Sequence, residues 1–405
     1  MPPEIAVVGA GTMGAGIAQL ALEHGHPVRL LDLDRSTAIR ARAGIEERLV
    51  RRLARRGLAG PELDANLAEV LGRLVVGVDP GDAAGASIVI EAIVEALDAK
   101  LALFDRLDQV VSPEAILATN TSALSVGAIA AAARRHPGRV VGLHFFNPAP
   151  VMPLVEVVGG ALTDPAVVEA AAALVAGWDR TPIRCADRPG FVVNRVNRPF
   201  TLQALRLLES GVADIGTIDA AIGSAGFPMG PFELMDLVGI DVNLAATTGI
   251  WEGFGRAARF RPSQIQAELV AAGRLGRKTG RGFYRYDHAG VRLGPARGFD
   301  RSGSQGPGPE LQDSVARRIR LAIVNEAFRA LDERVAADAV TIDLAVRLGA
   351  AHPQGPFSWA HDQGLPVVLA GLEALAPGDP DAFSPARGLL WAIDRQARAA
   401  SDRPA

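Results

Sequence analysis

The sequence has 405 residues, of which 49% are hydrophobic and only 5% aromatic, and its formal net charge is −3. This length predicts two or three domains with cores of Ala, Val, Leu and Ile. The small negative charge excludes a general attraction to nucleic acid or to an anionic membrane, so we expect neither as a partner. The single Cys185 excludes an intrachain disulfide framework, and no apolar run reaches the ~18–20 residues of a membrane span. Together these features favour a cytoplasmic location.

Short β-branched runs alternate with helical patterns through residues 4–160. We interpret the first run as a β-strand and not as a signal peptide, because it enters a glycine loop and lacks a basic leader. The predicted buried strands are Ile5–Val8, Val28–Leu31, Ile88–Ile90, Ile116–Ala118, Val140–Leu143 and, as a further candidate, Leu154–Val158. Strands separated by helices predict an α/β domain with a doubly wound, mostly parallel sheet.

Helical spacing dominates from about Asp187 onward and predicts all-α C-terminal domains. Within this part Thr217–Asp219 recurs as Thr341–Asp343, and Gly230–Phe232 recurs as Gly355–Phe357. Chance matching of two tripeptides is the alternative, but their shared order and near-equal separation favour a duplication. The sequence therefore predicts a sheet domain at 1–186, a helical domain at 187–286, a Gly/Pro-rich linker at 287–312 and a second, degenerate helical copy at 313–400.

A glycine loop follows the first strand and opens a helical pattern. Gly9 permits a tight turn, Gly11 lets a pyrophosphate approach the backbone, and Gly14 allows close packing of the helix. The helix N-terminus then offers free N–H groups and a partial positive charge to the phosphates. A Gly-rich turn without a ligand is the alternative. We expect a Rossmann-type dinucleotide site whose loop contacts come from Gly9, Gly11, Thr12, Met13 and Gly14.

Asp32 ends the second predicted strand, 18 residues after Gly14. A carboxylate at this place accepts hydrogen bonds from ribose hydroxyls and repels a 2′-phosphate, so it selects NAD over NADP. A solvated turn aspartate is the alternative. The nearby Arg35 could accommodate the extra phosphate of NADP, but NAD remains the favoured cofactor.

Four arginines cluster between Glu46 and Gly57 on a predicted helix whose Leu49 and Leu53 share one face: Arg48, Arg51, Arg52 and Arg55. Such a run is commonly a solvated helix face. Beside a dinucleotide site, however, it suits a substrate that carries phosphates, as coenzyme A does, because arginine forms charge-assisted contacts with phosphate oxygens.

His144 ends a predicted strand at the carboxyl edge of the sheet, where ligands of open α/β folds bind. Oxidation of an alcohol by NAD needs a base near neutral pKa, and a histidine provides one. Glu156, across a proline-rich turn, is the candidate carboxylate that orients the ring and stabilises the imidazolium. A core histidine bonded to a backbone carbonyl is the alternative. We predict no metal site.

Three further polar residues follow buried strands or open the helical part: Asn120, Ser122 and Asn194. A hydroxyl and an amide that face the substrate oxygen could hold the alcohol and stabilise a developing alkoxide. The alternatives are a Ser/Thr cap and an asparagine that satisfies a helix end.

Read together, these segments resemble the L-3-hydroxyacyl-CoA dehydrogenase family. The resemblance covers Gly9 to about Tyr286 and is carried by Gly9–Gly16, Glu91–Glu95, Asn120–Ser122, His144–Pro148, Pro189–Arg195 and Arg277–Phe283. It implies an NAD-dependent, reversible oxidation of (S)-3-hydroxyacyl-CoA to 3-oxoacyl-CoA.

The resemblance also implies residue roles. His144 would be the general base, Glu156 its orienting partner, and Ser122 and Asn194 contacts of the substrate oxygen. The implied cofactor contacts, beyond the glycine loop, are Asp32, Glu95, Lys100, Asn120, Ser122, Asn147 and Lys278. The arginine-rich helix would bind coenzyme A, although Arg48 stands where family members can carry a small polar residue.

Alternatives to this reading remain at the level of sequence. The same chemistry could act on a free 3-hydroxy acid of the sugar-acid or carnitine type, or the chain could bind NADH without turnover. Short family members form homodimers through their helical domain, so the second copy implies either a monomer with an internal pseudo-dimer or a homodimer.

Overall fold

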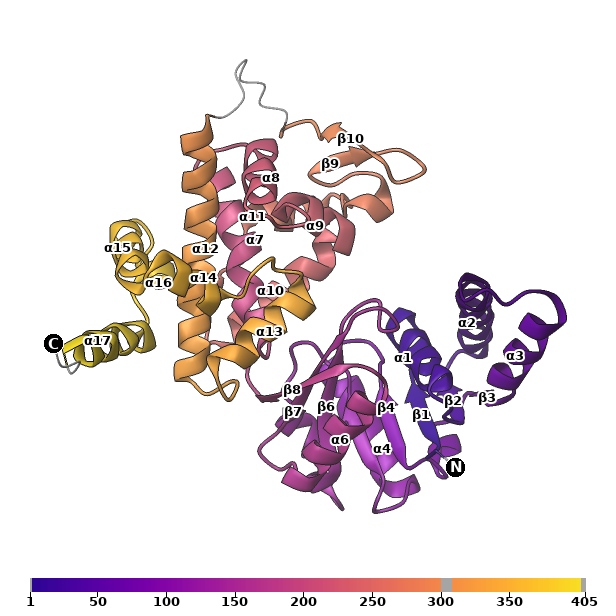
Figure 1. The fold of residues 1–405 in the computed structure, drawn as a ribbon. Helices are drawn as coiled ribbons and strands as arrows, with labels where there is room; N and C mark the ends of the chain where they lie inside the picture. The colour runs from indigo at the N-terminus through magenta and orange to yellow at the C-terminus, as the bar shows by residue number, and fades with distance from the viewer. Residues whose placement is uncertain (1, 300–307, 402–405) are drawn as a thin grey trace. The chain divides into compact units, whose positions relative to one another are not determined.

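The chain divides into two units, Met1–Asp187 and Arg188–Ala405, in a computed structural model that describes residues 2–299 and 308–401 (Figure 1). Residues 300–307 of the predicted linker lie outside the described residues. None of the helices in the described ranges combines the length and the apolar character that crossing a membrane requires.

One eight-stranded sheet organises the first unit, in the order β3-β2-β1-β4-β5-β6-β7-β8. Neighbouring strands are parallel except β6 and β7, which are antiparallel. The strands are β1 (Ile5–Val8), β2 (Val28–Leu31), β3 (Leu74–Gly77), β4 (Ile88–Glu91), β5 (Ile116–Thr119), β6 (Val140–Phe145), β7 (Leu154–Gly159) and β8 (Thr181–Ala186). The predicted doubly wound, mostly parallel sheet is confirmed.

Both faces of this sheet are covered by helices, since alternate residues of β1 enter opposite cores. Ile5 and Val7 pack with α1, α2 and α6, whereas Ala6 and Val8 pack with α4 and α5. This alternation follows from the two-residue period of a strand. The helices of the unit are α1 (Thr12–Glu23), α2 (Arg35–Arg55), α3 (Gly60–Gly72), α4 (Leu97–Val110), α5 (Val126–Ala130) and α6 (Pro165–Gly177).

The strands β3 and β8 were not predicted, and both lie at an edge of the sheet. An edge strand has only one neighbouring strand, so less of it is buried and its sequence shows a weaker apolar run. Val75 of β3 is 51% exposed, and β8 includes Pro182 and the exposed Arg184. The apolar runs that were predicted all belong to interior strands, β7 included.

Helices form most of the second unit, with one short hairpin. The long helices α7 and α12 lie side by side (Figure 1). The elements are α7 (Val193–Glu209), α8 (Ile215–Ser224), α9 (Pro231–Val238), α10 (Ile240–Gly253), α11 (Gln264–Ala271), β9 (Tyr284–Tyr286), β10 (Arg292–Pro295), α12 (Pro309–Asp332), α13 (Ala339–Ala350), α14 (Pro356–Gln363), α15 (Leu365–Leu375), α16 (Pro380–Phe383) and α17 (Arg387–Ser401). Within the segment interpreted as a linker, β10 pairs with β9, and α12 begins at Pro309.

The same local construction occurs twice in this unit. Asp219 in α8 accepts hydrogen bonds of 3.0 and 3.1 Å from N–H groups at the start of α9. Asp343 in α13 accepts 2.8 and 2.9 Å bonds from the start of α14. A Cβ atom at Gly230 or Gly355 would lie within 2.3 or 2.1 Å of these carboxylates, so each turn requires glycine. The recurring Thr-Ile-Asp and Gly-Pro-Phe motifs thus have one shared structural cause.

Candidate active site

His144 and Glu156 form a buried pair on the antiparallel strands β6 and β7. They are directly opposite in the strand register, so their side chains point to the same face of the sheet. The Nδ1 atom of His144 lies 2.6 Å from Oε2 of Glu156. Glu156 is fully buried and His144 is 6% exposed. The ring of Phe146 packs against the imidazole with 4.6 Å between ring centroids.

This contact defines the tautomer of the imidazole. When Glu156 is ionised, its carboxylate only accepts hydrogen bonds, so Nδ1 carries a proton and donates a hydrogen bond to Glu156. The lone pair of the neutral ring is therefore on Nε2. A histidine arranged in this way can take a proton through Nε2, and the carboxylate then stabilises the resulting imidazolium.

Asn120 and Ser122 follow β5, the strand beside β6. The side-chain oxygen of Asn120 accepts a 2.9 Å hydrogen bond from the N–H of Phe145 and thereby ties the ends of the two strands together. Ser122 donates from its N–H and its hydroxyl to Oε1 of Glu95, at 2.8 and 3.2 Å. The structure thus brings Ser122 and Glu95 together at the carboxyl edge of the sheet.

Lys100 connects Glu95 with a second carboxylate. Its Nζ atom lies 3.2 Å from Glu95 and 2.5 Å from Glu91, and Lys100 and Glu91 are both almost fully buried. Burial alone would raise the pKa of Glu95, but Lys100 and the hydrogen bonds from Thr121 and Ser122 outweigh it and hold this pKa below its usual value.

Sequence reasoning gave no role to Glu91 or to Thr119, whose hydroxyl donates a 2.6 Å hydrogen bond to Glu91. A signal was present, because an acidic residue that closes the apolar run Ile88–Ile90 needs a buried partner. The spacing did not identify that partner as Lys100.

The glycine loop has the shape that a dinucleotide requires. Gly9 has φ +103°, and a Cβ atom there would lie 2.5 Å from the carbonyl oxygen of Ala92. A Cβ at Gly14 would collide with the backbone of Gly9 at 1.7 Å, whereas the position above Gly11 is open. The open side lies at the N-terminus of α1, which begins at Thr12 with Met13 next to it. These residues fit the pyrophosphate of NAD.

Asp32 adjoins this loop at the end of β2. Its carboxylate accepts hydrogen bonds from the N–H groups of Ala10, at 2.8 Å, and Asp34, at 3.0 Å. The loop thus positions the carboxylate that the sequence interpretation assigned to the ribose. Asp34 caps α2, and hydrogen bonds from Ser36 and Thr37 lower its pKa to about 2.

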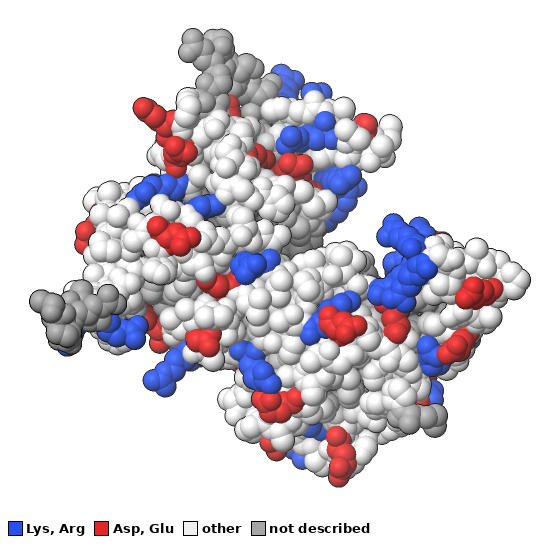
Figure 2. Space-filling model, viewed as in Figure 1, with Lys and Arg blue, Asp and Glu red and all other residues white. Residues whose placement is uncertain are grey.

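Four arginines of the C-terminal half of α2 line a pocket of about 650 Å³: Arg48, Arg51, Arg52 and Arg55. Figure 2 shows basic side chains gathered where α2 lies in Figure 1. Arg48 donates to Gln19 at 2.6 Å and Arg52 pairs with Glu23 at 2.7 Å, both on α1, while Arg51 and Arg55 are exposed. The lining residues are Thr12, Gly16, Gln19, Arg48, Arg51, Arg52, Arg55, Asn147, Pro148, Ala149, Pro150 and Val151.

Two predicted site residues belong to the second unit. Asn194 is the second residue of α7 and is half-buried. Lys278 is 45% exposed and pairs with both carboxylate oxygens of Asp241, at 2.6 and 2.7 Å.

A doubly wound sheet, a glycine loop beside a ribose-type aspartate, and a carboxylate-bound histidine at the sheet edge define an NAD-dependent dehydrogenase. Comparison with known proteins agrees. Residues 4–188 match the family model described as "3-hydroxyacyl-CoA dehydrogenase, NAD binding domain". Residues 190–286 and 315–397 match "3-hydroxyacyl-CoA dehydrogenase, C-terminal domain". We call 190–286 the first helical segment and 315–397 the second.

Relatives and solved structures carry the same description. The "3-hydroxyadipyl-CoA dehydrogenase" of Escherichia coli (strain K12) is 49% identical over 281 residues, which cover 69% of this chain and 58% of that protein. The mitochondrial hydroxyacyl-coenzyme A dehydrogenase of Sus scrofa is 40% identical over 286 residues, covering 70% of this chain and 90% of that protein. A crystal structure of 3-hydroxybutyryl-CoA dehydrogenase from E. coli K12 has a TM-score of 0.85 and 35% identity, and the match covers 98% of this chain and all of that one.

The chain belongs to the 3-hydroxyacyl-CoA dehydrogenase family, and its cofactor is NAD. The reaction of this class is the reversible, NAD-dependent oxidation of a 3-hydroxyacyl-CoA to a 3-oxoacyl-CoA.

Proposed function

We propose that the chain performs this oxidation with His144 as the general base and Glu156 as the carboxylate that orients it. The observation that carries the proposal is the 2.6 Å contact between Nδ1 of His144 and Glu156 inside the sheet. It orients the ring and, with a proton on Nδ1, makes Nε2 the nitrogen that accepts the substrate proton.

The proposed reaction needs few groups from the chain. Nε2 of His144 takes the proton of the 3-hydroxyl, and the Glu156 carboxylate stabilises the imidazolium that forms. Ser122 and Asn194 donate hydrogen bonds to the substrate oxygen and hold the C3–O bond in place. NAD⁺ supplies the acceptor for the hydrogen and electron pair that leave C3.

For the cofactor we propose contacts from both units. The loop around Gly11 receives the pyrophosphate, and Asp32 receives the adenine ribose. Further contacts come from residues at the carboxyl edge of the sheet and from the second unit: Glu95, Lys100, Asn120, Ser122, Asn147 and Lys278.

The pair His144 and Glu156 is tested by His144→Gln and Glu156→Gln. Each variant is expected to lower kcat by about 10²–10⁴ with NADH affinity, measured by fluorescence titration, near normal. His136→Gln is the matched control, because His136 also faces a carboxylate, Asp108 at 3.4 Å, at another place in the same unit. Wild-type kcat in either pair variant would remove the assignment.

We propose that the exposed Arg51 and Arg55 of α2 bind the phosphates of coenzyme A, with Arg48 and Arg52 beside them. Arg51→Gln and Arg55→Gln should raise KM for the acyl-CoA and leave kcat nearly unchanged, because the contact is far from the reacting atoms. Arg40→Gln on the same helix is the control, since Arg40 bonds to Ser36 and does not line the pocket. An unchanged KM for the acyl-CoA in both variants would show that coenzyme A binds elsewhere.

A substrate survey separates the alternatives. Turnover of 3-hydroxybutyryl-CoA but not of free 3-hydroxybutyrate would exclude a dehydrogenase of free hydroxy acids. A failure to oxidise NADH with acetoacetyl-CoA and longer 3-oxoacyl-CoAs would favour an NADH-binding protein without turnover. The relatives are named for four-carbon and for six-carbon dicarboxylic acyl groups, and we include both in the survey.

We propose that the second helical segment is a degenerate copy of the first that serves in place of a dimer partner. A monomer at micromolar concentration in light scattering agrees with that proposal, and a homodimer contradicts it. A cytoplasmic location remains a prediction.

A further inference from the structure

Arg198 in α7 has a buried guanidinium group that no carboxylate neutralises within the described residues. The side chain is 6% exposed, and its one hydrogen bond runs from Nη1 to Oγ1 of Thr247, 3.1 Å away in α10. Its Nε atom is buried without a hydrogen-bond partner. Burial lowers the pKa of Arg198 to about 10, with no opposite charge to raise it.

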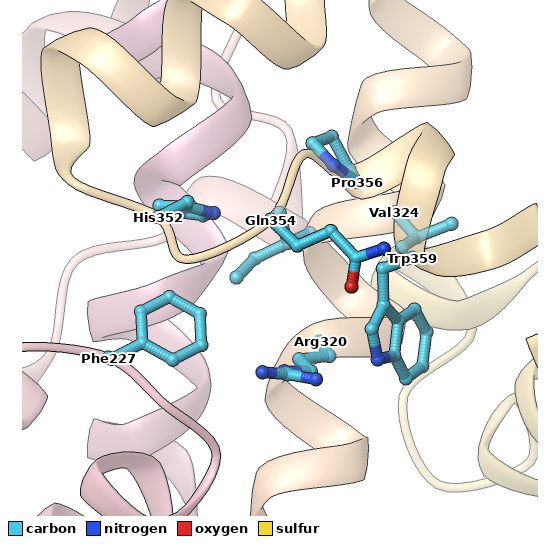
Figure 3. Close-up of a pocket in the computed structure, with 8 residues that line it drawn as sticks. Phe227, Arg320, Val324, His352, Gln354, Pro356 and Trp359 are labelled. Carbon is cyan, nitrogen blue, oxygen red and sulfur yellow. The ribbon is translucent and has the colours of Figure 1, made fainter. Parts of the chain in front are cut away.

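Two other arginines of this unit, one buried and one half-buried, have groups that compensate their charge. Arg195 is fully buried but pairs with Glu326 at 2.7 Å and with Glu333 at 2.7 and 2.8 Å. Arg320 lacks a carboxylate, yet its guanidinium lies between the rings of Phe227 and Trp359, 5.4 and 5.6 Å from their centroids (Figure 3).

Arg198 has neither a carboxylate partner nor flanking aromatic rings among the described residues. An unpaired buried charge is costly, and an apolar side chain of similar size would pack there at lower cost. Packing of α7 therefore does not account for an arginine at this position.

Thr247 also orients the guanidinium group of Arg198. The hydroxyl of Thr247 donates to the carbonyl oxygen of Asn243 at 2.8 Å, so it offers a lone pair to the guanidinium. One guanidinium nitrogen is anchored in this way, and the rest of the planar group keeps donors for another anion.

The position of Arg198 along α7 relates it to the substrate. It follows Asn194 by four residues, so the two side chains share one helix face with Cβ atoms about 5–6 Å apart. In the proposed function Asn194 contacts the 3-oxygen of the acyl chain, and the present inference rests on that proposal.

We propose that Arg198 binds a carboxylate at the far end of the acyl chain, which makes the substrate a dicarboxylic 3-hydroxyacyl-CoA. In a six-carbon chain three carbon–carbon bonds of about 1.5 Å separate C3 from the terminal carboxyl carbon, a span of at most about 4.5 Å that is of the same order as the ~5.4 Å pitch of a helical turn. A guanidinium and a carboxylate form charge-assisted, bidentate hydrogen bonds, so each would supply the counter-charge that the other lacks.

This pairing would make Arg198 a determinant of specificity. An acyl chain of equal length that ends in a methyl group would leave the guanidinium buried and unpaired. Sites built to bond a polar group discriminate strongly against analogues that lack it. The wild-type protein should therefore prefer 3-hydroxyadipyl-CoA to 3-hydroxyhexanoyl-CoA.

The test measures kcat/KM for these two substrates in the full chain. Arg198→Met should lower the value for 3-hydroxyadipyl-CoA by about 10²-fold and leave the value for 3-hydroxyhexanoyl-CoA unchanged or higher. Arg320→Met is the control, because it removes a half-buried arginine of the same unit and should leave the ratio of the two values unchanged. An unaltered ratio in Arg198→Met overturns the proposal.

A second measurement avoids any dependence on how the variant folds. Wild-type protein should bind adipyl-CoA at least about tenfold more tightly than hexanoyl-CoA in a competition assay, and equal affinities overturn the inference. If neither hydroxyacyl-CoA is oxidised by the wild type, the proposed function itself fails. If both are oxidised without a response to Arg198, only this inference fails.

Discussion

The two helical segments share a framework but differ in the residues that bear chemistry. In both segments an aspartate accepts hydrogen bonds from N–H groups at the start of a helix, Asp219 in the first and Asp343 in the second. Both segments also need glycine at that turn. The repeat spacing of 124 residues aligns Asn194 with Arg318 and Arg198 with Ala322. The framework therefore depends on Asp and Gly, whereas the chemistry depends on other positions that can change independently.

The segments also contact each other through ion pairs on α7. Near its N-terminus, the fully buried Arg195 meets Glu326 and Glu333 of the second segment. At its C-terminal end, Arg206 meets Asp379 where the two side chains are 19% and 17% exposed. The second segment thus supplies counter-charges next to Asn194, although it lacks the polar residues proposed for the reaction.

The largest effect is expected where this contact is buried. Glu326→Gln should lower the free energy of unfolding by about 3–5 kcal/mol, because it removes the buried counter-charge of Arg259 and leaves the fully buried Arg195 with only the partly exposed Glu333. Asp379→Asn should cost less, about 1 kcal/mol, because its partner is partly solvated. Denaturant unfolding measures both, and equal losses would contradict the distinction between the two ends of α7.

The second prediction compares aligned positions. Asn194→Ala should lower kcat by about 10²–10³ through loss of one donor to the substrate oxygen. Arg318→Ala, at the matching position of the second segment, should leave kcat within a factor of about two, because no reacting group is proposed there. Steady-state kinetics with 3-hydroxybutyryl-CoA decides, and a comparable drop in Arg318→Ala would mean that both segments take part in turnover.

A smaller effect than that of Glu326→Gln is expected for the two framework aspartates. Asp219→Asn and Asp343→Asn should each lower the free energy of unfolding by about 1–3 kcal/mol, because the NH2 group that replaces one carboxylate oxygen cannot accept the second N–H. Thermal unfolding measures these losses. A neutral result at either position would show that the corresponding turn does not need its carboxylate.

Asp219 adds a pH dependence to this pair. Burial raises its pKa to about 7, so the folded state binds a proton that the unfolded state releases near pH 4. The resulting stability is present below about pH 4 and is lost as the pH rises through about 7. The stability difference between wild type and Asp219→Asn should therefore shrink between pH 5 and 8, and a constant difference would contradict the raised pKa.

The sequence predicted those parts of the molecule that produce a local pattern of residues. Short β-branched runs that alternate with helical patterns predicted the interior strands, and the glycines with Asp32 predicted the dinucleotide loop. The edge strands β3 and β8 were missed because they are only partly buried: Leu74 is the buried residue of β3, and Ile183 and Cys185 are those of β8. Partners distant in sequence also escaped. The position of Glu91 in the sequence does not show that it pairs with Lys100. The position of Arg198 does not show that its side chain is buried without a carboxylate partner.

The reversal of β7 against β6 separates two properties of the enzyme. His144 and Glu156 stay opposite each other as long as the ladder between the strands is kept, whatever the length of the connecting loop at residues 146–153. That loop supplies the wall of the pocket beside α2. Insertions there could reshape what the pocket admits without disturbing the proton acceptor, whereas a slip of one residue in the ladder would turn the carboxylate to the opposite face.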